Sequence, residues 1–512
     1  MGEAVISLRN VSKSFGEVLA NDNVSMDIYK GEILSLLGEN GSGKTTLMNM
    51  LSGIYYPDSG HISVNGKAVN IRDPKDAFEC GIGMVHQHFK LVDVFTAAEN
   101  VVVGIKNKGP FDLRSVAAQI KDICDKYGFV MDPNKKVYDM SVSEKQTLEI
   151  IKVIYRGADI LILDEPTAVL TPQETERLFT VIRNMKKDGK TVIIITHKLH
   201  EVLSISDRVA ILRKGAYIDA VATKDATEES LTEMMVGEKV ELNIERPEVK
   251  DKKLRLKVEH LSCYNADGIK MLDDVSFEAY SGEILGIAGV SGNGQKELLE
   301  SVAGLQNTMP GSSISYYSPE DDKERELLGL TPRKIRELGV HLSFVPEDRL
   351  GMGLVGSMGM SENMMLKDYS EGNSIFTDKK KPKELAEQIL KELKVVTPGI
   401  STPVRRLSGG NVQKVLVGRE IAASPAVLMT AYAVRGLDIN TSYTIYRLLN
   451  EQKTSGVAVI YVGEDLDVLM ELCDRILVLC GGRVSGILDG KSAKKEDIGR
   501  LMTTYGGGKE KK

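Results

Sequence analysis

The strongest constraint on the fold is that the chain contains one pattern twice. Residues 23–38 (NVSMDIYKGEILSLLG) reappear as residues 274–289 (DVSFEAYSGEILGIAG), 251 positions later. A second pair, residues 206–215 and 473–482, is separated by 267 positions. Repetition over this length indicates two copies of one structural unit in tandem. The growing offset predicts about sixteen additional residues in the second copy, and the charged stretches 319–326 and 377–383 are the candidate insertions.

Length and linker composition give the domain boundaries. A chain of 512 residues exceeds the usual size of one domain. Between the copies lies a polar stretch that contains Pro247, and the chain ends in a run of glycine and lysine. We predict a first domain at 1–240, a linker at 241–253, a second domain at 254–505 and a frayed tail at 506–512.

Composition excludes several classes of protein. The net charge of -6 argues against a nucleic-acid partner, which usually requires a basic excess. The start of the chain lacks a secretory pattern, and its apolar runs stop short of the ~20 residues of a membrane-spanning helix. The five cysteines show no CxxC spacing, which is typical of reduced thiols in a cytoplasmic protein.

Apolar runs predict the fold class. Residues 160–163 (ILIL) and 192–195 (VIII) are continuous rather than alternating. This pattern is typical of strands covered on both faces, as in a parallel sheet flanked by helices. Each copy is therefore predicted to be an α/β domain.

A phosphate-binding loop is predicted in the first copy. Residues 38–45 (GENGSGKT) fit G-x-x-x-x-G-K-[ST] between an apolar strand and a helix start, a context that disfavours an ordinary glycine-rich turn. Glycines let backbone N–H groups converge on phosphate oxygens. Lys44 would neutralise the β- and γ-phosphates, and the Thr45 hydroxyl would bind Mg²⁺. The candidate ATP-binding residues here are Gly38, Glu39, Asn40, Gly41, Ser42, Gly43, Lys44, Thr45 and Thr46.

A second motif supplies two carboxylates. The run ILIL ends in Asp164 and Glu165, which places both at the carboxyl edge of the sheet. Asp164 is the predicted Mg²⁺ ligand, and Glu165 is the predicted group that polarises the attacking water. An isolated Asp-Glu pair would be a solvated turn, so the prediction depends on the glycine-rich loop.

With these motifs the chain resembles the ATP-binding cassette (ABC) family over nearly its whole length. The resemblance implies two tandem P-loop NTPase domains, each with a mostly parallel sheet, an antiparallel β part and a helical subdomain. Gln87 matches the glutamine that coordinates Mg²⁺ and reports to the membrane partner, and His197 matches the histidine that contacts the γ-phosphate. Phe15 stands where such cassettes stack an aromatic ring on adenine, although a core residue is an equal alternative.

The resemblance also implies that each ATP lies between one cassette's phosphate loop and the other's LSGGQ-type signature. In the second copy this signature is intact, whereas the first copy has Val142 and Ser143 in place of glycines. The second copy's phosphate machinery is altered instead: Gln295 replaces Lys44, Ala431-Tyr432 replaces the Asp-Glu pair, Glu464 replaces His197, and Glu347 stands near the Gln87 position. We predict one consensus and one degenerate site, the consensus site being completed by Ser408, Gly409, Gly410, Asn411 and Asp438.

The family resemblance implies the function. Twin-cassette chains of this kind are similar to the ATPase subunits of bacterial importers for monosaccharides and nucleosides, and residues 85–96 and 292–295 look closer to the nucleoside branch. We expect ATP hydrolysis at the cytoplasmic face of the plasma membrane. A separate permease would make the membrane contact, and a binding lipoprotein would deliver the substrate. A soluble ribosome or DNA factor and a regulatory scaffold without turnover are the alternatives.

Overall fold

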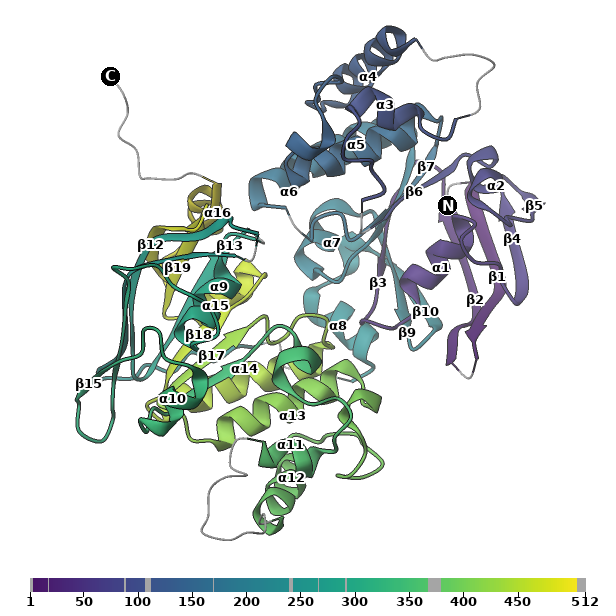
Figure 1. Cartoon of the computed structure of the whole chain (residues 1–512). Helices are drawn as coiled ribbons and strands as arrows, with labels where there is room; N and C mark the ends of the chain where they lie inside the picture. The colour runs from purple at the N-terminus through teal and green to yellow at the C-terminus, as the bar shows by residue number, and fades with distance from the viewer. Residues whose placement is uncertain are drawn as a thin grey trace, which may run out of the picture. The chain divides into compact units, whose positions relative to one another are not determined.

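The computed structural model describes residues 3–16, 18–86, 89–105, 112–168, 170–238, 243–265, 267–290, 292–366 and 379–503. The chain divides into two compact units, Met1–Glu241 and Leu242–Lys512 (Figure 1). The predicted tail at 506–512 and the first two linker residues lie outside the described residues. No helix within the described ranges is both long enough and apolar enough to cross a membrane.

The first unit is built on a six-stranded sheet. Its strand order is β10-β9-β3-β8-β7-β6, and all neighbours run parallel except β9 and β10. The three central strands β3, β7 and β8 are buried along their whole length, as their continuous apolar runs predict. The strands are β3 (Ile33–Leu37), β6 (Ile82–Val85), β7 (Ile160–Asp164), β8 (Thr191–Ile195), β9 (Arg208–Arg213) and β10 (Ala216–Ala222).

A four-stranded antiparallel sheet covers one side of this core. Its order is β2-β1-β4-β5, with β1 (Ala4–Phe15), β2 (Val18–Tyr29), β4 (Ser59–Val64) and β5 (Lys67–Val69). Leu8 and Val24 from this sheet share a buried apolar cluster with Leu36 of β3 and Leu47 of the first helix. The loop between β3 and that helix is therefore held by packing on both sides.

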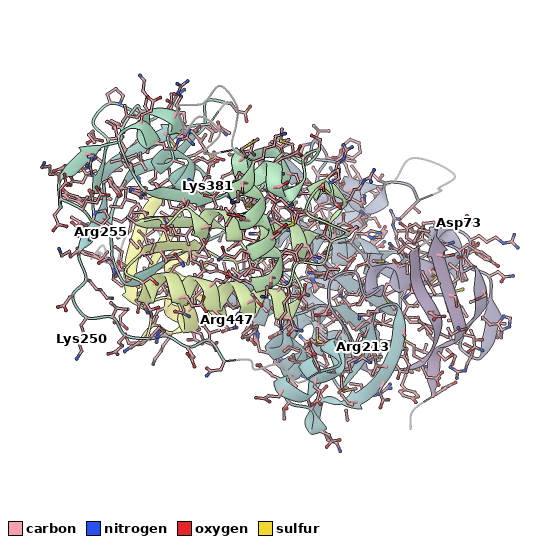
Figure 2. All side chains as sticks on the ribbon, turned by 90° about the horizontal axis from the view of Figure 1, so that it is seen from below. Asp73, Arg213, Lys250, Arg255, Lys381 and Arg447 are labelled. Carbon is pink, nitrogen blue, oxygen red and sulfur yellow. The ribbon has the colours of Figure 1, made fainter. Side chains whose placement is uncertain are left out.

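Three helices of the first unit form a separate subdomain. Helices α3, α4 and α5 pack against one another and form the helical subdomain (Figure 1). Arg213 of β9, labelled in Figure 2, donates a hydrogen bond to the Met234 carbonyl of α8. The helices are α1 (Lys44–Leu51), α2 (Pro74–Glu79), α3 (Ala97–Val102), α4 (Leu113–Tyr127), α5 (Val142–Tyr155), α6 (Pro172–Lys187), α7 (Leu199–Ile205) and α8 (Glu228–Val236), with 3₁₀ turns at Val137–Asp139 and Thr223–Asp225.

The second unit repeats this plan. Its sheets have the orders β16-β17-β18-β13-β19-β20 and β12-β11-β14-β15. The strands are β11 (Leu254–Tyr264), β12 (Lys270–Tyr280), β13 (Glu283–Gly289), β14 (Ser313–Tyr317), β15 (Glu324–Glu326), β16 (Leu342–Val345), β17 (Val427–Ala431), β18 (Ala458–Val462), β19 (Arg475–Cys480) and β20 (Arg483–Asp489). The helices are α9 (Gln295–Val302), α10 (Pro332–Glu337), α11 (Met360–Met365), α12 (Lys380–Glu392), α13 (Gly409–Ala422), α14 (Ile439–Thr454), α15 (Leu466–Leu472) and α16 (Lys495–Thr503). The predicted fold class, with parallel core, antiparallel part and helical subdomain in each copy, is confirmed.

Two features lengthen the second copy. The charged stretch 319–326 forms a long turn and then β15, whereas β4 and β5 are joined by only two residues. A π-helical turn at Arg349–Gly353 follows β16 and has no counterpart in the described part of the first unit. Part of the other candidate insertion, 377–383, lies outside the described residues.

The polar stretch between the copies is attached to the second unit. Residues 243–250 form no helix or strand, and Lys250 projects from this segment (Figure 2). Arg246 donates to the carbonyls of Met470 and Cys473 at 2.9 and 2.8 Å. Ile244 is buried in the core of the second unit. The described part of the stretch is therefore packed rather than extended into solvent.

Candidate functional site

The loop between β3 and α1 requires glycine at two positions. Gly43 has φ of 95°, in the left-handed region, and a Cβ there would lie 2.3 Å from the Ala20 carbonyl oxygen. A Cβ on Gly38 would lie 2.2 Å from the Leu212 carbonyl oxygen. The backbone can therefore approach a ligand closely at both ends of the loop, and its N–H groups lead directly into α1.

Two side chains of the loop, Lys44 and Ser42, indicate that it can bind an anion. The ammonium of Lys44 folds back onto the carbonyls of Gly38 and Glu39 at 2.6 and 2.9 Å. Burial lowers the pKa of Lys44, and the charges of Glu165 and Asp164 oppose this shift. The hydroxyl of Ser42 is buried without a hydrogen-bond partner among the described residues. A buried polar atom of this kind requires a partner, and phosphate oxygens in the loop would provide one.

Asp164 and Thr45 fit a magnesium ion brought by the nucleotide. Asp164 ends β7, and the Thr45 hydroxyl donates a hydrogen bond to its carboxylate. Within the described ranges no group of three His, Cys, Asp or Glu side chains could hold a metal alone. Mg²⁺ commonly takes one or two protein oxygens and completes its shell with phosphates and water. Carboxylate and hydroxyl oxygens at this edge meet that requirement.

Glu165 and His197, the predicted catalytic residues, lie in direct contact. Glu165 has φ of 47°, and its N–H donates to the Ile195 carbonyl at 2.9 Å. Its carboxylate lies 3.0 Å from Nδ1 of His197. The hydrogen bond from His197 holds the pKa of Glu165 below its ordinary value despite burial. Glu165 is therefore ionised at neutral pH, in a rarely adopted conformation fixed by its neighbours.

Burial, and then the neighbouring charge of Glu165, raise the pKa of Asp164 from 3.8 to about 6. A carboxyl group whose folded-state pKa is raised stabilises the protein below the unfolded pKa, and this stability is lost as the pH rises through the folded pKa. Asp164→Asn should therefore raise the unfolding free energy of the nucleotide-free protein at pH 8 by at most about 3 kcal/mol. Its melting temperature at pH 8 should rise accordingly. The difference should shrink between pH 6 and 4 in thermal unfolding scans. An equal gain at pH 4 and pH 8 would contradict this electrostatic assignment.

Three further residues of the first copy were predicted to bind the nucleotide or its metal ion: Phe15, Gln87 and Thr46. Phe15 ends β1, and its ring packs edge-on against Tyr55 with 5.0 Å between the ring centroids. It is 43% exposed, so the alternative of a core residue is wrong. Gln87 lies outside the described residues. Thr46 follows Thr45 in the first turn of α1.

The signature segment of the first copy lacks the two glycines of the second copy's signature, and it contains a carboxylate, Glu144. In the first copy, Ser141 caps α5 and accepts from the Glu144 N–H, while the Glu144 carboxylate accepts from the Ser141 N–H. Burial would raise the pKa of Glu144, but hydrogen bonds from Lys135 and Ser141 outweigh it and lower the pKa. A negative charge thus occupies this helix N-terminus. The S-x-x-E pattern of a capping box was the available sequence signal.

In the second copy no side chain caps the corresponding helix N-terminus. Ser408 is the N-cap of α13 and makes no side-chain cap, and its hydroxyl accepts from Asn411 at 2.9 Å. Gly409 and Gly410 form the first turn of α13. A Cβ on Gly410 would lie 3.2 Å from the carboxylate of Asp438, which caps α14. The predicted signature residues are therefore grouped within the second unit at a helix start built from two glycines.

The second unit keeps the backbone conformation found at Glu165 but not the side chains of that sheet edge. Tyr432 has φ of 50°, and its N–H donates to the Val462 carbonyl, matching Glu165. Burial raises the pKa of Tyr432 to about 12, so its hydroxyl is neutral and cannot act as a base at pH 7. Glu464 and Glu347 are both paired with Arg435.

Comparison with known proteins agrees with this geometry. The family model described as ABC transporter matches residues 21–168 and 272–430. The chain is 40% identical over 505 residues to the nucleoside import ATP-binding protein NupA of Lactococcus lactis, covering 98% of each chain. It is 41% identical to the guanosine import ATP-binding protein NupO of Bacillus subtilis, covering 98% of this chain and 97% of that one. A ribose import ATP-binding protein, RbsA of Clostridium tetani, is 37% identical, with coverage of 98% and 97%.

The chain belongs to the ABC transporter family, and it contains two cassettes. The resemblance drawn from its motifs is thereby confirmed, together with the expectation that it is an ATP-binding enzyme.

Proposed function

We propose that this chain hydrolyses ATP to power nucleoside import through a separate membrane permease. The observation that carries the proposal is the assembled set of Lys44, Asp164, Glu165 and His197 in a chain that matches nucleoside importers along its whole length. A regulatory scaffold without turnover would have no use for the Glu165–His197 pair. A nucleic-acid factor is disfavoured by the net charge of -6.

Each residue of the first site has a role in this proposal. The loop N–H groups and Lys44 hold the β- and γ-phosphates, and the Lys44 ammonium exchanges its carbonyl partners for phosphate oxygens. Mg²⁺, held by Thr45 and Asp164, would neutralise phosphate charge. Glu165 accepts a hydrogen bond from the attacking water, and His197 orients Glu165. Phe15 offers an exposed ring for adenine, and Gln87 is proposed to be a further Mg²⁺ ligand.

We further propose that the second cassette's signature supplies the remaining donors. The N-terminus of α13, which no side chain caps, is suited to a phosphate. Its residues are Ser408, Gly409, Gly410 and Asn411. The α5 N-terminus is not, because Glu144 already occupies it. The first copy has the intact phosphate-binding residues, and the second copy has the intact signature. This distribution supports a single complete site.

The partners and place of action follow from this role. Relatives are named as import ATP-binding proteins, so the chain would act at the cytoplasmic face of the plasma membrane. It would be bound to permease subunits, with a substrate-binding lipoprotein outside. Ribose or a related sugar is the second candidate, because RbsA proteins also match the full length.

Uptake measurements test the proposal. Cells that lack this chain should lose uptake of radiolabelled guanosine or another nucleoside but retain ribose uptake. The wild-type chain should restore uptake, and Lys44→Ala should not. Loss of ribose uptake with normal nucleoside uptake would replace the nucleoside assignment by the sugar assignment. Failure of the chain to co-purify with a polytopic membrane protein would contradict the importer role.

A further inference from the structure

An arginine side chain lies beside the first residue of the second cassette's signature helix. Arg349 begins the π-helical turn that follows β16. A Cβ on Gly409, the first residue of α13, would lie 3.3 Å from Nη1 of Arg349. Nη2 of the same guanidinium donates a hydrogen bond to the Arg435 carbonyl. The guanidinium is therefore fixed through one nitrogen, while another lies against the start of α13.

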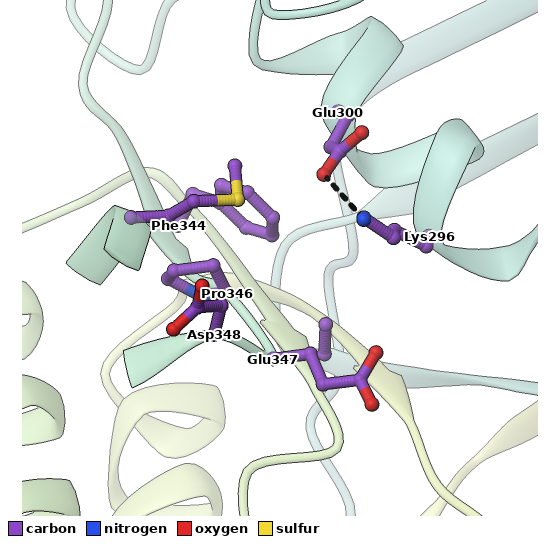
Figure 3. A pocket seen from close by; sticks show the side chains of 8 residues that line it. Lys296, Glu300, Phe344, Pro346, Glu347 and Asp348 are labelled. Carbon is purple, nitrogen blue, oxygen red and sulfur yellow. Dashed lines mark ion pairs between the residues drawn. The ribbon is translucent and has the colours of Figure 1, made fainter. Parts of the chain in front are cut away.

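The two carboxylates that precede Arg349 in the chain have other partners. Glu347 and Asp348 line the cavity drawn in Figure 3. The Glu347 carboxylate is 2.5 Å from the Arg435 guanidinium, and the Asp348 carboxylate accepts from the Gly351 N–H at 2.8 Å. Within the described ranges, no carboxylate forms an ion pair with Arg349.

Two further carboxylates in this part of the second unit are also engaged. Asp438 accepts from the N–H and the hydroxyl of Thr441 at 2.8 and 2.7 Å. Glu464 is 3.2 Å from the Arg435 guanidinium. Arg435 is thus neutralised by two carboxylates, Glu347 and Glu464, whereas the described residues give Arg349 a carbonyl and no counter-ion.

The position of Arg349 is unfavourable for a cation that has no ligand. Partial burial, and then the like charge of Arg435, lower the pKa of Arg349. The N-terminus of α13 carries a partial positive charge from the helix dipole, which also repels a guanidinium. Such a group is suited to bind an anion, because an anion would relieve the repulsion and receive donors from both the guanidinium and the helix.

The first copy lacks this cation. Strands β6 and β16 match at an offset of 260 residues, so that Phe89 stands where the second copy has Arg349. The N-terminus of α5 is occupied by the Glu144 carboxylate instead. The cation therefore accompanies the signature that is proposed to bind phosphate, and the other signature has a negative charge.

We propose that Arg349 binds the γ-phosphate of ATP together with the N-terminus of α13 and stabilises the charge that develops on this phosphate during hydrolysis. Arginine suits this role because its guanidinium remains charged and forms charge-assisted hydrogen bonds to phosphate oxygens. The Arg435 carbonyl holds Nη2, and Nη1 donates to the phosphate. This inference rests on the crossed site proposed above, in which the second signature completes the first phosphate loop.

Photolabelling of the full-length chain tests the contact with the γ-phosphate. Azido-ATP and azido-ADP would be cross-linked to chains that carry Glu165→Gln, which prevents turnover, and labelled peptides of the first unit would be quantified by mass spectrometry. Arg349→Gln should raise the azido-ATP concentration for half-maximal labelling about tenfold or more. The value for azido-ADP should change less than about twofold, because ADP has no γ-phosphate. Unchanged azido-ATP labelling, or equal losses with both nucleotides, would overturn the proposal.

ATPase rates separate phosphate binding from a structural role. Glutamine can still donate to the Arg435 carbonyl but has no charge, so Arg349→Gln should lower kcat at least about 100-fold. Arg349→Lys keeps the charge and should be at least about tenfold faster than Arg349→Gln. The melting temperature without nucleotide should not fall in Arg349→Gln, because the cation that it removes has no counter-ion. A Gln variant with wild-type kcat, or one that melts earlier and is no slower than the Lys variant, would show that Arg349 is structural.

Arg447→Gln is the matched control, because Arg447 is an exposed arginine of α14 on the same unit (Figure 2). It should change labelling and kcat by less than about twofold.

Failure of this inference is distinguishable from failure of the crossed site. Loss of hydrolysis in Ser408→Arg but not in Arg349→Gln would overturn the role of Arg349 and leave the crossed site intact. Wild-type hydrolysis in both variants would overturn both proposals.

Discussion

Glu165→Gln should bind ATP and fail to turn it over. Glutamine keeps the size of the side chain and can still contact His197, but it cannot accept a proton from water. Loss of an aligned general base lowers rates by on the order of 10²–10⁴-fold. The expected steady-state ATPase rate is therefore near background, while equilibrium binding of ATP is within a few-fold of the wild type.

Tyr432→Phe is the matched control in the second copy. Tyr432 has the same backbone conformation as Glu165, but burial keeps its hydroxyl protonated. Removal of this hydroxyl should change the ATPase rate by less than about twofold, because a protonated hydroxyl cannot act as a general base. A Glu165→Gln chain that retains half of the wild-type rate would show that a second base is active.

Ser408→Arg should also abolish ATP hydrolysis, although Ser408 belongs to the other cassette. The α13 N-terminus is proposed to bind the γ-phosphate that Lys44 holds, and a long side chain at the N-cap would block it. Loss of one group that stabilises transition-state charge typically lowers rates by about 10²–10³-fold. The ATPase rate is the measurement, in the presence of the permease where it can be obtained.

Ser141→Arg provides the comparison for this variant. Ser141 holds the same position in α5, but Glu144 fills the helix N-terminus there. Removing its cap should destabilise α5 by about 1 kcal/mol and leave most of the ATPase activity. Equal losses in the Ser408 and Ser141 variants would contradict the assignment of the complete site to the second signature.

The sequence predicted those parts of the structure that depend on local pattern. Continuous apolar runs identified the buried strands β7 and β8, and the G-x-x-x-x-G-K-T spacing identified a loop whose glycines are required by close backbone neighbours. The fold of both copies followed from the repeat. The Lys44, Asp164 and Glu165 positions were predictable because strand ends of a parallel sheet share one edge.

Features that depend on contacts between distant residues were not predicted. The pairing of Arg435 with both Glu347 and Glu464 joins three separate loops of the second unit. No periodic pattern in the sequence predicts the π-helical turn at Arg349–Gly353. The engagement of Glu144 by Lys135 depends on how the preceding loop packs against α5. Phe15 could not be assigned from propensity alone, because its exposure depends on which residues pack around the end of β1.

The central claim is that one of the two phosphate loops supports hydrolysis, and the steady-state ATPase rates of Lys44→Ala and Gln295→Ala test it most directly. Lys44→Ala removes the ammonium from the intact loop and should lower the rate at least about 100-fold. Gln295→Ala removes a neutral side chain from a loop beside Ala431 and Tyr432, and the rate should change by only a few-fold. Comparable losses in the two variants would contradict the account, because both loops would then contribute to turnover.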